Sequence, residues 1–503
     1  MDLRASDTDP GASGAEDEDE TPAQKRLRLA KLYLESVKDD LAEGDFDAAD
    51  IDKEIISARL KQDVMEHAGK VHLFIADSLE LGEPSSRPFV RLRGHRFSVT
   101  SAVASEACTY LFTAGKEGSI IKWDIRTGKK LAIYHKQRPS VKGKERAWNE
   151  DVKGHMDEVL SLALSSDGVY LASAGKDRRV GVWDVAKSEW VTSFGGHKDT
   201  ISAVAFRKGS RQLYTASHDR TVKLFDLSPG VMGYVETLFG HQDPILGLDA
   251  LRAETCVTVG GRDRTARFWK IVDESQLVFR GGGRSKLREL LEGGALEGMD
   301  QDETSDNGRR KNDNKVTETR YVEGSLDCIA MIDETTFLTG GDSGSICLWA
   351  IQKKKPIFTQ PLAHGLHEMQ SETEGLIRSP RYITALACLR YSDLFASGSW
   401  EGSIRLWKLD RSSKFRSFSL VAQVPAPGFV NSIQLLSIPK GALDEASWTR
   451  KAELDKNEAS TPVALLVAGM GQEPRLGRWM QLKGEGITNS TIVMVLHSRS
   501  HVA

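Results

Sequence analysis

The sequence is short of the features that mark secreted, membrane-spanning and metal-binding proteins. Among its 503 residues are only five cysteines, Cys108, Cys256, Cys328, Cys347 and Cys388. No two of them form a CxxC pair, so their spacing predicts no zinc site, and an odd number in mostly apolar runs indicates reduced core thiols. No apolar run approaches the length of a membrane span, and no secretory signal opens the chain. We therefore expect an intracellular protein without a cofactor, a metal site or a membrane contact.

Motifs of catalysis are missing too. The chain has no Gly-rich phosphate loop and no isolated nucleophile, and the pair His364 and His367 falls in what reads as a loop with little to suggest metal binding. An enzyme needs one perturbed set of groups in one cleft. We predict a protein that is not an enzyme.

Charge is the next constraint. The net charge is −3, but residues 1–20 hold eight acids against Arg4, a local charge of −7, which leaves the remainder at about +4. A mildly basic body is compatible with a nucleic-acid partner, although charge governs association rather than fold.

What the sequence does contain is a repeat. Gly-His dipeptides end at residues 95, 155, 197 and 241, and an aromatic follows each His by 28 residues, at Trp123, Trp183, Phe225 and Trp269. Trp349, Trp407 and Trp479 close three similar segments that lack a Gly-His ahead of them. A fixed period of this kind predicts an array of identical structural units, here seven.

Most units also carry a hydroxyl residue and an acid at fixed distances before the aromatic. The hydroxyl lies ten positions before it, at Thr113, Ser173, Thr215, Thr339 and Ser397, with Val259 in its place in the fourth unit. The acid lies six positions before it, at Glu117, Asp177, Asp219, Asp263, Glu401 and Glu473, with Ser343 in the fifth unit. A buried imidazole and a buried carboxylate persist only when each satisfies the other.

This pattern resembles the WD-repeat family. The resemblance implies an all-β, seven-bladed propeller over residues 71–503, with Phe89–Arg93 adding the outer strand of the last blade. The residues that would fasten the blades are His95, Thr113, Trp123, His155, Ser173, Asp177, Trp183, His197, Thr215, Asp219, His241, Asp263 and Trp269. His, Ser and Asp are also the residue types of a hydrolase catalytic triad, but their repetition around a ring indicates that they are structural groups.

Several segments fall outside the repeat. Residues 1–20 read as a disordered acidic tail. Residues 21–70 predict a helical arm, because Thr21-Pro22-Ala23-Gln24 is a capping box and apolar residues follow at spacings of three and four. Insertions are expected at about 281–320 and 438–461, and a third, Leu366–Arg381, precedes the sixth unit.

Basic residues surround the acid of each unit. Lys116, Lys176, His218 and Arg262 precede it, Arg178, Arg220 and Arg264 follow it, and Arg179 comes next in the second unit. In the last unit Gln472, Arg475 and Arg478 cluster beside Trp479. Two interpretations stay open. These residues either serve their turns locally, or form a positive rim that contacts phosphates.

Five strings depart from the generic repeat and resemble one family, the U3 small nucleolar RNA-associated 55K proteins. They are KRLRLAKLYLESV, IISARLKQDVMEHAGK, GGRDRT, ESQLVF and VAGMGQEPRLGRWMQLK, and in the first unit GHRFSVT and SIIKWD match the same family. The resemblance implies a nucleolar scaffold of the U3 small nucleolar ribonucleoprotein that recognises the box B/C region of U3 RNA. Its partners would be the small kink-turn-binding protein and other box C/D and small-subunit processome proteins, and its role pre-rRNA processing toward 18S rRNA. The alternative is a WD-repeat adaptor that binds a peptide in the central channel.

Overall fold

The computed structural model describes residues 71–80, 89–137, 153–281, 324–371, 375–439, 441–443, 446, 448, 461–477, 480–484 and 486–498. The chain divides into two compact units, residues 1–68 and 69–503, and every described residue belongs to the second. The predicted acidic tail, the helical arm and most of the insertions at 281–320 and 438–461 lie outside the described residues.

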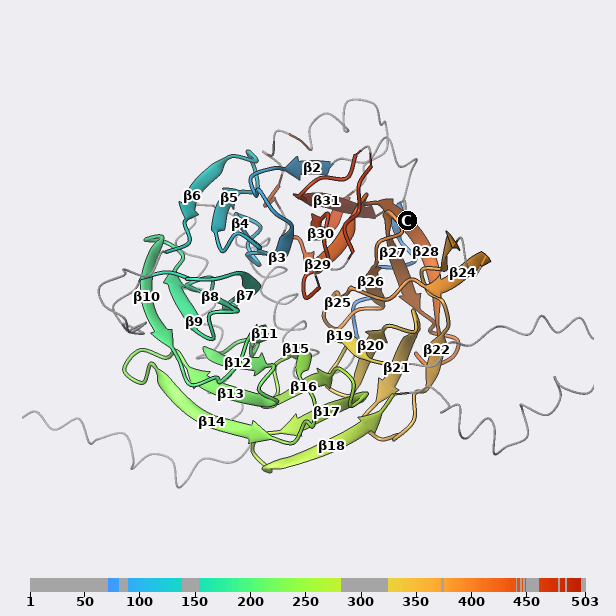
Figure 1. Cartoon of the computed structure of the whole chain (residues 1–503), viewed down its shortest axis with the longest axis horizontal. Coiled ribbons are helices and arrows are strands. Elements are labelled where there is room, and N and C mark those ends of the chain that lie inside the picture. The colour runs from blue at the N-terminus through green and yellow to red at the C-terminus, as the bar shows by residue number, and fades with distance from the viewer. Residues whose placement is uncertain are drawn as a thin grey trace, which may run out of the picture. The chain divides into compact units, whose positions relative to one another are not determined.

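The second unit is a ring of seven blades, each an antiparallel sheet, arranged around a central channel (Figure 1). Blades 1 to 4 are β3 (Val99–Ala104), β4 (Tyr110–Gly115), β5 (Ile120–Asp124) and β6 (Lys130–Tyr134); β7 (Val159–Leu164), β8 (Tyr170–Gly175), β9 (Val180–Asp184) and β10 (Glu189–Phe194); β11 (Ile201–Phe206), β12 (Gln212–Ser217), β13 (Thr221–Asp226) and β14 (Gly233–Phe239); and β15 (Ile245–Ala250), β16 (Thr255–Gly260), β17 (Thr265–Lys270) and β18 (Ser275–Arg280). Blades 5 and 6 are β19 (Leu326–Met331), β20 (Thr336–Gly341), β21 (Ile346–Ala350) and β22 (Phe358–Gln360), then β25 (Ala385–Cys388), β26 (Leu394–Gly398), β27 (Ser403–Leu409) and β28 (Phe418–Pro425). The seven-bladed propeller is confirmed.

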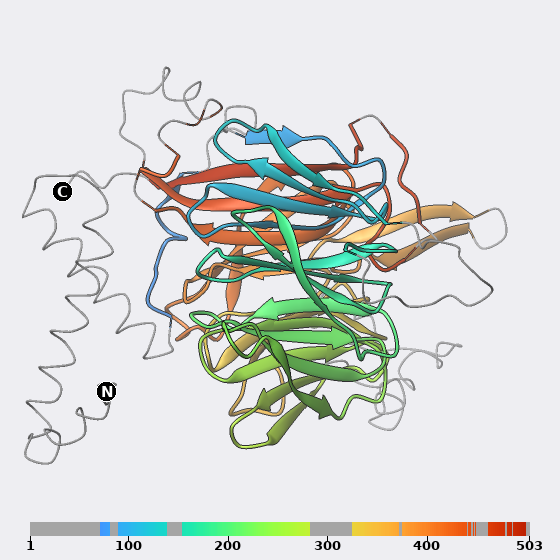
Figure 2. The same cartoon turned by 90° about the vertical axis from the view of Figure 1, so that its left-hand side faces the viewer.

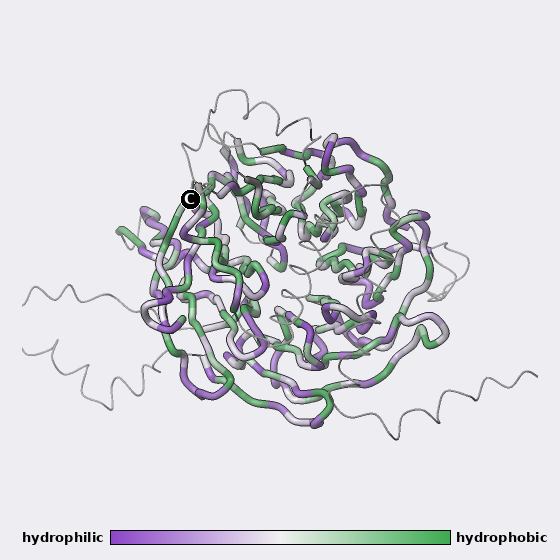
Figure 3. Tube along the Cα trace, turned by 180° about the vertical axis from the view of Figure 1, so that it is seen from behind, coloured by the Kyte–Doolittle hydropathy of each residue, from purple (hydrophilic) through white to green (hydrophobic). Residues whose placement is uncertain are grey.

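The core lies between neighbouring blades rather than inside any one of them. Strand β7, with the sequence VLSLAL, is buried over its first five residues, whereas the outer strand β10 alternates between exposed and partly buried residues. Val180 and Ala172 of blade 2 pack with Phe206 of blade 3 in one apolar cluster. Inner strands are covered on both faces, so they read as continuous hydrophobic runs. Figure 3 shows hydrophobic residues running along the strands of every blade.

Blade 7 closes the ring with strands from both ends of the unit. Its strands β29 (Phe429–Ser437), β30 (Thr461–Gly471) and β31 (Ser490–Ser498) are completed by β2 (Phe89–Leu92), which pairs with β31 so that Leu92 lies opposite Thr491. The short strand β1 (Leu79–Glu80) extends the same edge of β31. This confirms the closure predicted from residues 89–93. Pairing every blade removes the open sheet edge that a linear array would leave.

The segment before β1 lies against blade 6. The backbone N–H groups of Ile75 and Ala76 donate to Asp393 Oδ1 at 2.9 and 3.1 Å, and Leu73 forms an isolated parallel bridge with Ser392. The first part of the unit is therefore held to the ring by buried hydrogen bonds.

The insertion before blade 6 is ordered. Strands β23 (Leu366–Ser371) and β24 (Gly375–Pro380) form a hairpin that projects beyond the blades (Figure 2). Part of the 438–461 insertion is described as well. Leu443 and Ala446 are buried between blades 1 and 7, and Trp448 Nε1–H donates to the Ile125 carbonyl at 2.9 Å.

All five cysteines are buried free thiols, as the sequence predicted. Burial raises the pKa of the Cys108 thiol to about 11, which keeps it protonated and unreactive at neutral pH. Among the described residues no helix is long and apolar enough to cross a membrane.

Closure predicts which side chain of β2 matters for stability. Leu92 is 5% exposed in the cluster between blades 1 and 7, whereas Phe89 on the same strand is 45% exposed. Leu92→Ala should therefore lower stability by about 2–5 kcal/mol, the usual loss for a truncated core leucine. Phe89→Ala is the matched control and should leave the apparent Tm within a degree or so in a thermal unfolding scan. Equal effects of the two variants would mean that β2 does not close the ring.

Candidate nucleic-acid interface

A chain of hydrogen bonds fastens the blades at the tight turns between their second and third strands. In blade 2, His155 Nδ1 lies 2.7 Å from Asp177 Oδ2 and His155 Nε2 lies 2.6 Å from Ser173 Oγ, which also accepts the Trp183 Nε1–H at 2.8 Å. A neutral imidazole donates from one nitrogen and accepts at the other. Nδ1–H therefore donates to the carboxylate, and the serine hydroxyl donates to Nε2.

The same set recurs with small changes in other blades. Blade 1 uses His95, Glu117, Thr113 and Trp123, and blade 3 uses His197, Asp219 and Thr215 with Phe225 in the tryptophan position. In blade 4 the hydroxyl belongs to Thr258, which lies 2.8 Å from both His241 Nε2 and Trp269 Nε1. The fixed offset pointed to Val259, but the neighbouring residue supplies the oxygen. Blade 5 keeps only the Trp349 to Thr339 bond.

His364 lies in a turn, as expected, whereas His367, which was also expected in a loop, lies in strand β23. His364 is fully buried, with Nδ1 2.7 Å from Glu401 Oε1 and Nε2 2.8 Å from Ser397 Oγ, so it is the blade 6 histidine. The hairpin β23–β24 is inserted between this His and its partners, which is why the spacing concealed it. His367 lies apart from it, 4.6 Å from the ring of Trp400. No group of three or more metal-ligating side chains occurs in the described part of the chain.

The last blade departs from the repeat. Glu473, the expected acid of that blade, instead accepts Lys116 Nζ at 2.9 Å. The third strand of the blade is β31, which begins at Ser490, well beyond Trp479. Trp479 and Arg478 lie outside the described residues.

Electrostatics agree with a neutral imidazole in blades 4 and 6. Burial disfavours the charged ring and lowers the pKa of His241 and of His364, against the opposing pull of Asp263 and Glu401. Burial also disfavours the charged carboxylates, yet hydrogen bonds from His364 and Arg405 outweigh it and lower the pKa of Glu401 to about 2. The set is thus a neutral ring held by an ionised acid.

The residue after the acid adopts a left-handed backbone conformation in six blades. Its φ is 81° at Gly118, 63° at Arg178, 69° at Arg220, 53° at Arg264, 68° at Gly344 and 98° at Gly402. Glycine takes this conformation freely, whereas a residue with a Cβ atom is strained there by roughly 1–2 kcal/mol. Three blades follow the backbone preference, and three place arginine against it.

Four of the predicted rim residues expose their side chains to some degree. Arg220, Arg262 and Arg264 are exposed, and Arg178 is partly exposed with a long hydrogen bond of 3.3 Å from its guanidinium to the Lys198 carbonyl. They all lie in the turns between second and third strands, so the meander places them on one face of the ring. We call this face the turn face.

Two other predicted residues, Lys116 and Arg179, are buried, which corrects the expectation that they line the rim, whereas Lys176 is partly exposed but paired. Lys116 is 8% exposed and bonds to Glu473 and to the Gly477 carbonyl, the latter at 2.8 Å. Arg179 is 8% exposed, next to the fastened Asp177. Lys176 pairs with Glu158 at 2.6 Å.

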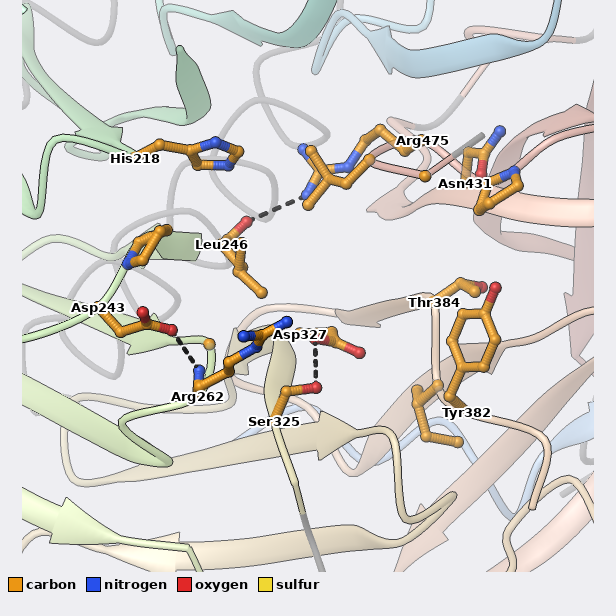
Figure 4. A pocket seen from close by; sticks show the side chains of 16 residues that line it. His218, Asp243, Leu246, Arg262, Ser325, Asp327, Tyr382, Thr384, Asn431 and Arg475 are labelled. Atoms are coloured by element: carbon orange, nitrogen blue, oxygen red, sulfur yellow. Dashed lines mark hydrogen bonds between the residues drawn. The ribbon is translucent and has the colours of Figure 1, made fainter. Parts of the chain in front are cut away.

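Arg475 reaches across the channel rather than outward. Its guanidinium donates to the Leu246 carbonyl at 3.1 Å (Figure 4). It also donates to the Ser202 carbonyl at 2.6 Å, with a longer contact of 3.5 Å to Leu160. These carbonyls belong to inner strands of blades 3, 4 and 2. Desolvation lowers the pKa of this Arg, but the guanidinium stays charged at any physiological pH. Arg475 therefore ties blade 7 to the opposite side of the ring.

The surroundings of His218 and Gln472 do not suit phosphate binding either. Burial lowers the pKa of His218, and its ring lines the channel as a neutral group. Gln472 is partly buried, and its backbone N–H donates to Asn489 Oδ1 at 3.0 Å.

Comparison with known proteins identifies the chain. The family model described as "WD domain, G-beta repeat" matches residues 86–124, 149–184, 188–226, 233–270 and 376–408. Ribosomal RNA-processing protein 9 of Saccharomyces cerevisiae is 31% identical over 95% of this chain and 90% of its own length. U3 small nucleolar RNA-interacting protein 2 of Homo sapiens is 36% identical over 92% of this chain and 80% of its own length. The solved structure of U3-55K is 35% identical, with a TM-score of 0.61 over 81% of this chain and 98% of that one. The chain belongs to the U3 snoRNP-associated WD-repeat family.

The matches to the generic repeat fit the geometry of this U3 snoRNP family member. They omit every strand of blade 5 and the strands β29, β30 and β31 of blade 7, and these are the two blades in which no histidine set occurs among the described residues. The blades that depart from the repeat in sequence are therefore those without the histidine hydrogen-bond set.

The buried position of His364 gives a stability prediction. His364→Ala would leave Glu401 without its ring partner, and stranding one member of a buried pair typically costs about 3–5 kcal/mol. We expect a large fall in apparent Tm in thermal unfolding. His367→Ala, on the hairpin side of the same segment, is the control and should change Tm little. A small effect of His364→Ala would show that Arg405, which also pairs with Glu401, is sufficient alone.

The pKa shifts predict acid sensitivity in two stages. The pKa values of His241 and His364 in the folded protein lie below the unfolded value near 6.5. As the pH falls below 6.5, the unfolded chain therefore binds more protons than the folded chain. Stability should be fully present above about pH 6.5 and decline as the pH falls below it. The lowered pKa of Glu401 and of Asp177 adds a further loss below about pH 4. Denaturant melts from pH 8 to pH 3 measure both stages, and a flat profile between pH 7 and 5 would contradict neutral buried rings.

Proposed function

We propose that the chain is a non-catalytic RNA-binding scaffold of the U3 small nucleolar ribonucleoprotein. It recognises the box B/C region of U3 RNA beside the small kink-turn-binding protein and acts in the nucleolus, in the pre-rRNA processing that leads to 18S rRNA. The relatives named for U3 RNA interaction and ribosomal RNA processing support this assignment. The turn face supplies the physical surface for it.

The observation that carries the proposal is the placement of arginine at strained turn positions. Arg178, Arg220 and Arg264 occupy left-handed positions where Gly118 and its counterparts in two other blades serve the same turn. Nothing in the backbone requires arginine there. The exception is better explained by what the side chains can contact, since sequences that break a local preference usually do so for a functional reason.

The arrangement suits an RNA backbone. Arg262 adds a fourth cation on the turn face, and within the described residues it forms no ion pair. Guanidinium groups in three consecutive blades form an arc of donors that can each contact a phosphate. Such contacts release counterions, so affinity should fall steeply with salt.

The peptide-adaptor alternative is disfavoured by Arg475. A peptide that enters a propeller channel commonly needs an open axis, whereas this guanidinium already bonds to carbonyls of facing blades. A protein in which the channel is bridged internally is better suited to bind at its face.

A triple glycine substitution tests the turn face with little risk to folding. Arg178→Gly, Arg220→Gly and Arg264→Gly should leave Tm unchanged or slightly raised, because glycine relieves the left-handed strain. The variant should weaken binding to a box B/C RNA by an order of magnitude or more at low salt. The slope of log K against log salt should also become less steep. The change should correspond to the loss of roughly two to three phosphate contacts, each of which contributes about 0.9 to the slope on a duplex. Fluorescence anisotropy over a salt series measures both.

The matched control removes the same charge from the opposite face. Lys353, Lys354 and Lys355 are exposed between β21 and β22, a connection at the other end of the blades. Replacing all three by alanine should leave the salt slope as in the unaltered protein. If both triple variants lose the same RNA affinity, the loss reflects net charge rather than the turn face, and the proposal is contradicted.

A further inference from the structure

A cavity of about 570 Å³ opens at the turn-face end of the channel, beside the loop that carries Arg475. Its walls come from the starts of the inner strands of blades 4 to 7 and from Arg262 of the turn in blade 4. Arg262 therefore belongs both to the exposed arc of arginines and to the cavity wall. Cavities of this size hold small ligands or single side groups of a larger one.

The charges lining the cavity cancel. Asp243 and Asp327 face Arg262 and Arg475, and the remaining titratable ring, His218, is neutral because burial lowers its pKa. In Figure 4, Arg475 and His218 lie on one side of the cavity, and Arg262, Asp327 and Tyr382 lie on the other. A balanced site gains nothing from a charged occupant, since a cation would meet two guanidinium groups and an anion two carboxylates. The occupant that fits is neutral and polar.

Hydrogen-bond acceptors remain free in the cavity, whereas the donors of Arg475 are used by backbone carbonyls. Asp327 Oδ1 accepts the Ser325 hydroxyl at 2.9 Å, and its second oxygen makes no hydrogen bond within the described residues. Asn431 is 3% exposed, and both of its described bonds, to the Val99 and Glu473 carbonyls, use Nδ2. Its Oδ1 is buried without a partner in the described structure. A buried acceptor left unpaired is costly, so a ligand that donates N–H groups suits this site.

An aromatic surface completes the wall. Tyr382 lines the cavity, and its ring packs at 6.3 Å from Trp400 and 6.5 Å from Phe429. Among the described residues its hydroxyl forms one long hydrogen bond, to Met480 Sδ at 4.0 Å. A ring supported in this way is a stacking platform for a planar group.

We propose that this cavity receives a single unpaired guanine base from the RNA bound on the turn face. Asp327 accepts hydrogen bonds from the ring N1–H and the exocyclic amine, and Tyr382 stacks on the base. Guanine is favoured because it is neutral, planar and presents two adjacent donors to one carboxylate, whereas uracil and adenine present an acceptor beside a single donor group. The inference rests on the proposed RNA-binding function, because only an RNA on the turn face brings a base to Arg262.

The first test uses mononucleotides, which separates base recognition from RNA binding. Saturation-transfer NMR on the full chain with guanosine, adenosine, cytidine and uridine monophosphates should give a response to the guanine nucleotide that exceeds the others severalfold. Asp327→Asn should abolish this preference. The variant should remain folded, because burial already disfavours the Asp327 carboxylate and raises its pKa to about 6. Tyr382→Phe keeps the ring and should retain binding, while Tyr382→Ala should lose it.

The second test uses a box B/C RNA. Asp327→Asn should weaken its binding about tenfold, the usual discrimination of one bidentate base contact, with no change in salt slope. The triple glycine variant of the turn face should instead change the slope.

If the RNA binds but neither Asp327→Asn nor guanosine monophosphate affects it, the base pocket is refuted and the RNA-binding function stands. If the RNA does not bind at all, the proposed function itself fails. If a blocked arginine tripeptide gives a stronger NMR response than guanosine monophosphate, the cavity is a protein-binding site and the guanine assignment is overturned.

Discussion

The turn face depends on a neutral imidazole held between a carboxylate and a hydroxyl. In blade 2 this ring joins the connection that enters the blade, at His155, to the turn at Asp177 and the strand at Ser173. Each bond is buried, so breaking one would strand a polar group without water. The backbone of the turn is fixed as a result. Arg178 is then presented from a rigid site, which limits the entropy lost when its side chain contacts a ligand.

The pairing of β2 with β31 and the hydrogen bonds of Arg475 across the channel both oppose opening of the ring. The pairing of β2 with β31 joins neighbouring blades at the perimeter. Arg475 joins blades that face each other, because its donors bond to inner-strand carbonyls of Ser202 and Leu246. A propeller whose blades contact only their neighbours can open at one seam. A guanidinium that spans the axis opposes this opening and gives the cavity beside it a defined floor.

The sequence predicts the fold well because the repeat is a local pattern. A His and an aromatic separated by 28 residues identify four blades without any knowledge of long-range contacts. The same rule fails where a segment is inserted, as at His364, whose partner Ser397 is 33 residues away instead of 18. The signal that could have found it is Glu401, an acid at the correct distance before Trp407 that had no histidine assigned. Arg475 could not be placed from sequence, since only closure of the ring brings its loop opposite blades 2 to 4.

Under the proposed RNA-binding function, the contrast between glycine and arginine at the left-handed turn position separates the needs of the fold from those of binding. Where the turn serves the blade alone, as at Gly344 and Gly402, the residue is the one the backbone favours. Where three consecutive blades accept strain, the side chains form an arc that ends at Arg262, on the wall of the cavity. In the proposed complex, the arc of cations and the charge-balanced pocket with unused acceptors would have separate roles in recognising RNA. Cations hold a backbone of any sequence, and only a pocket with fixed acceptors can distinguish one base from another.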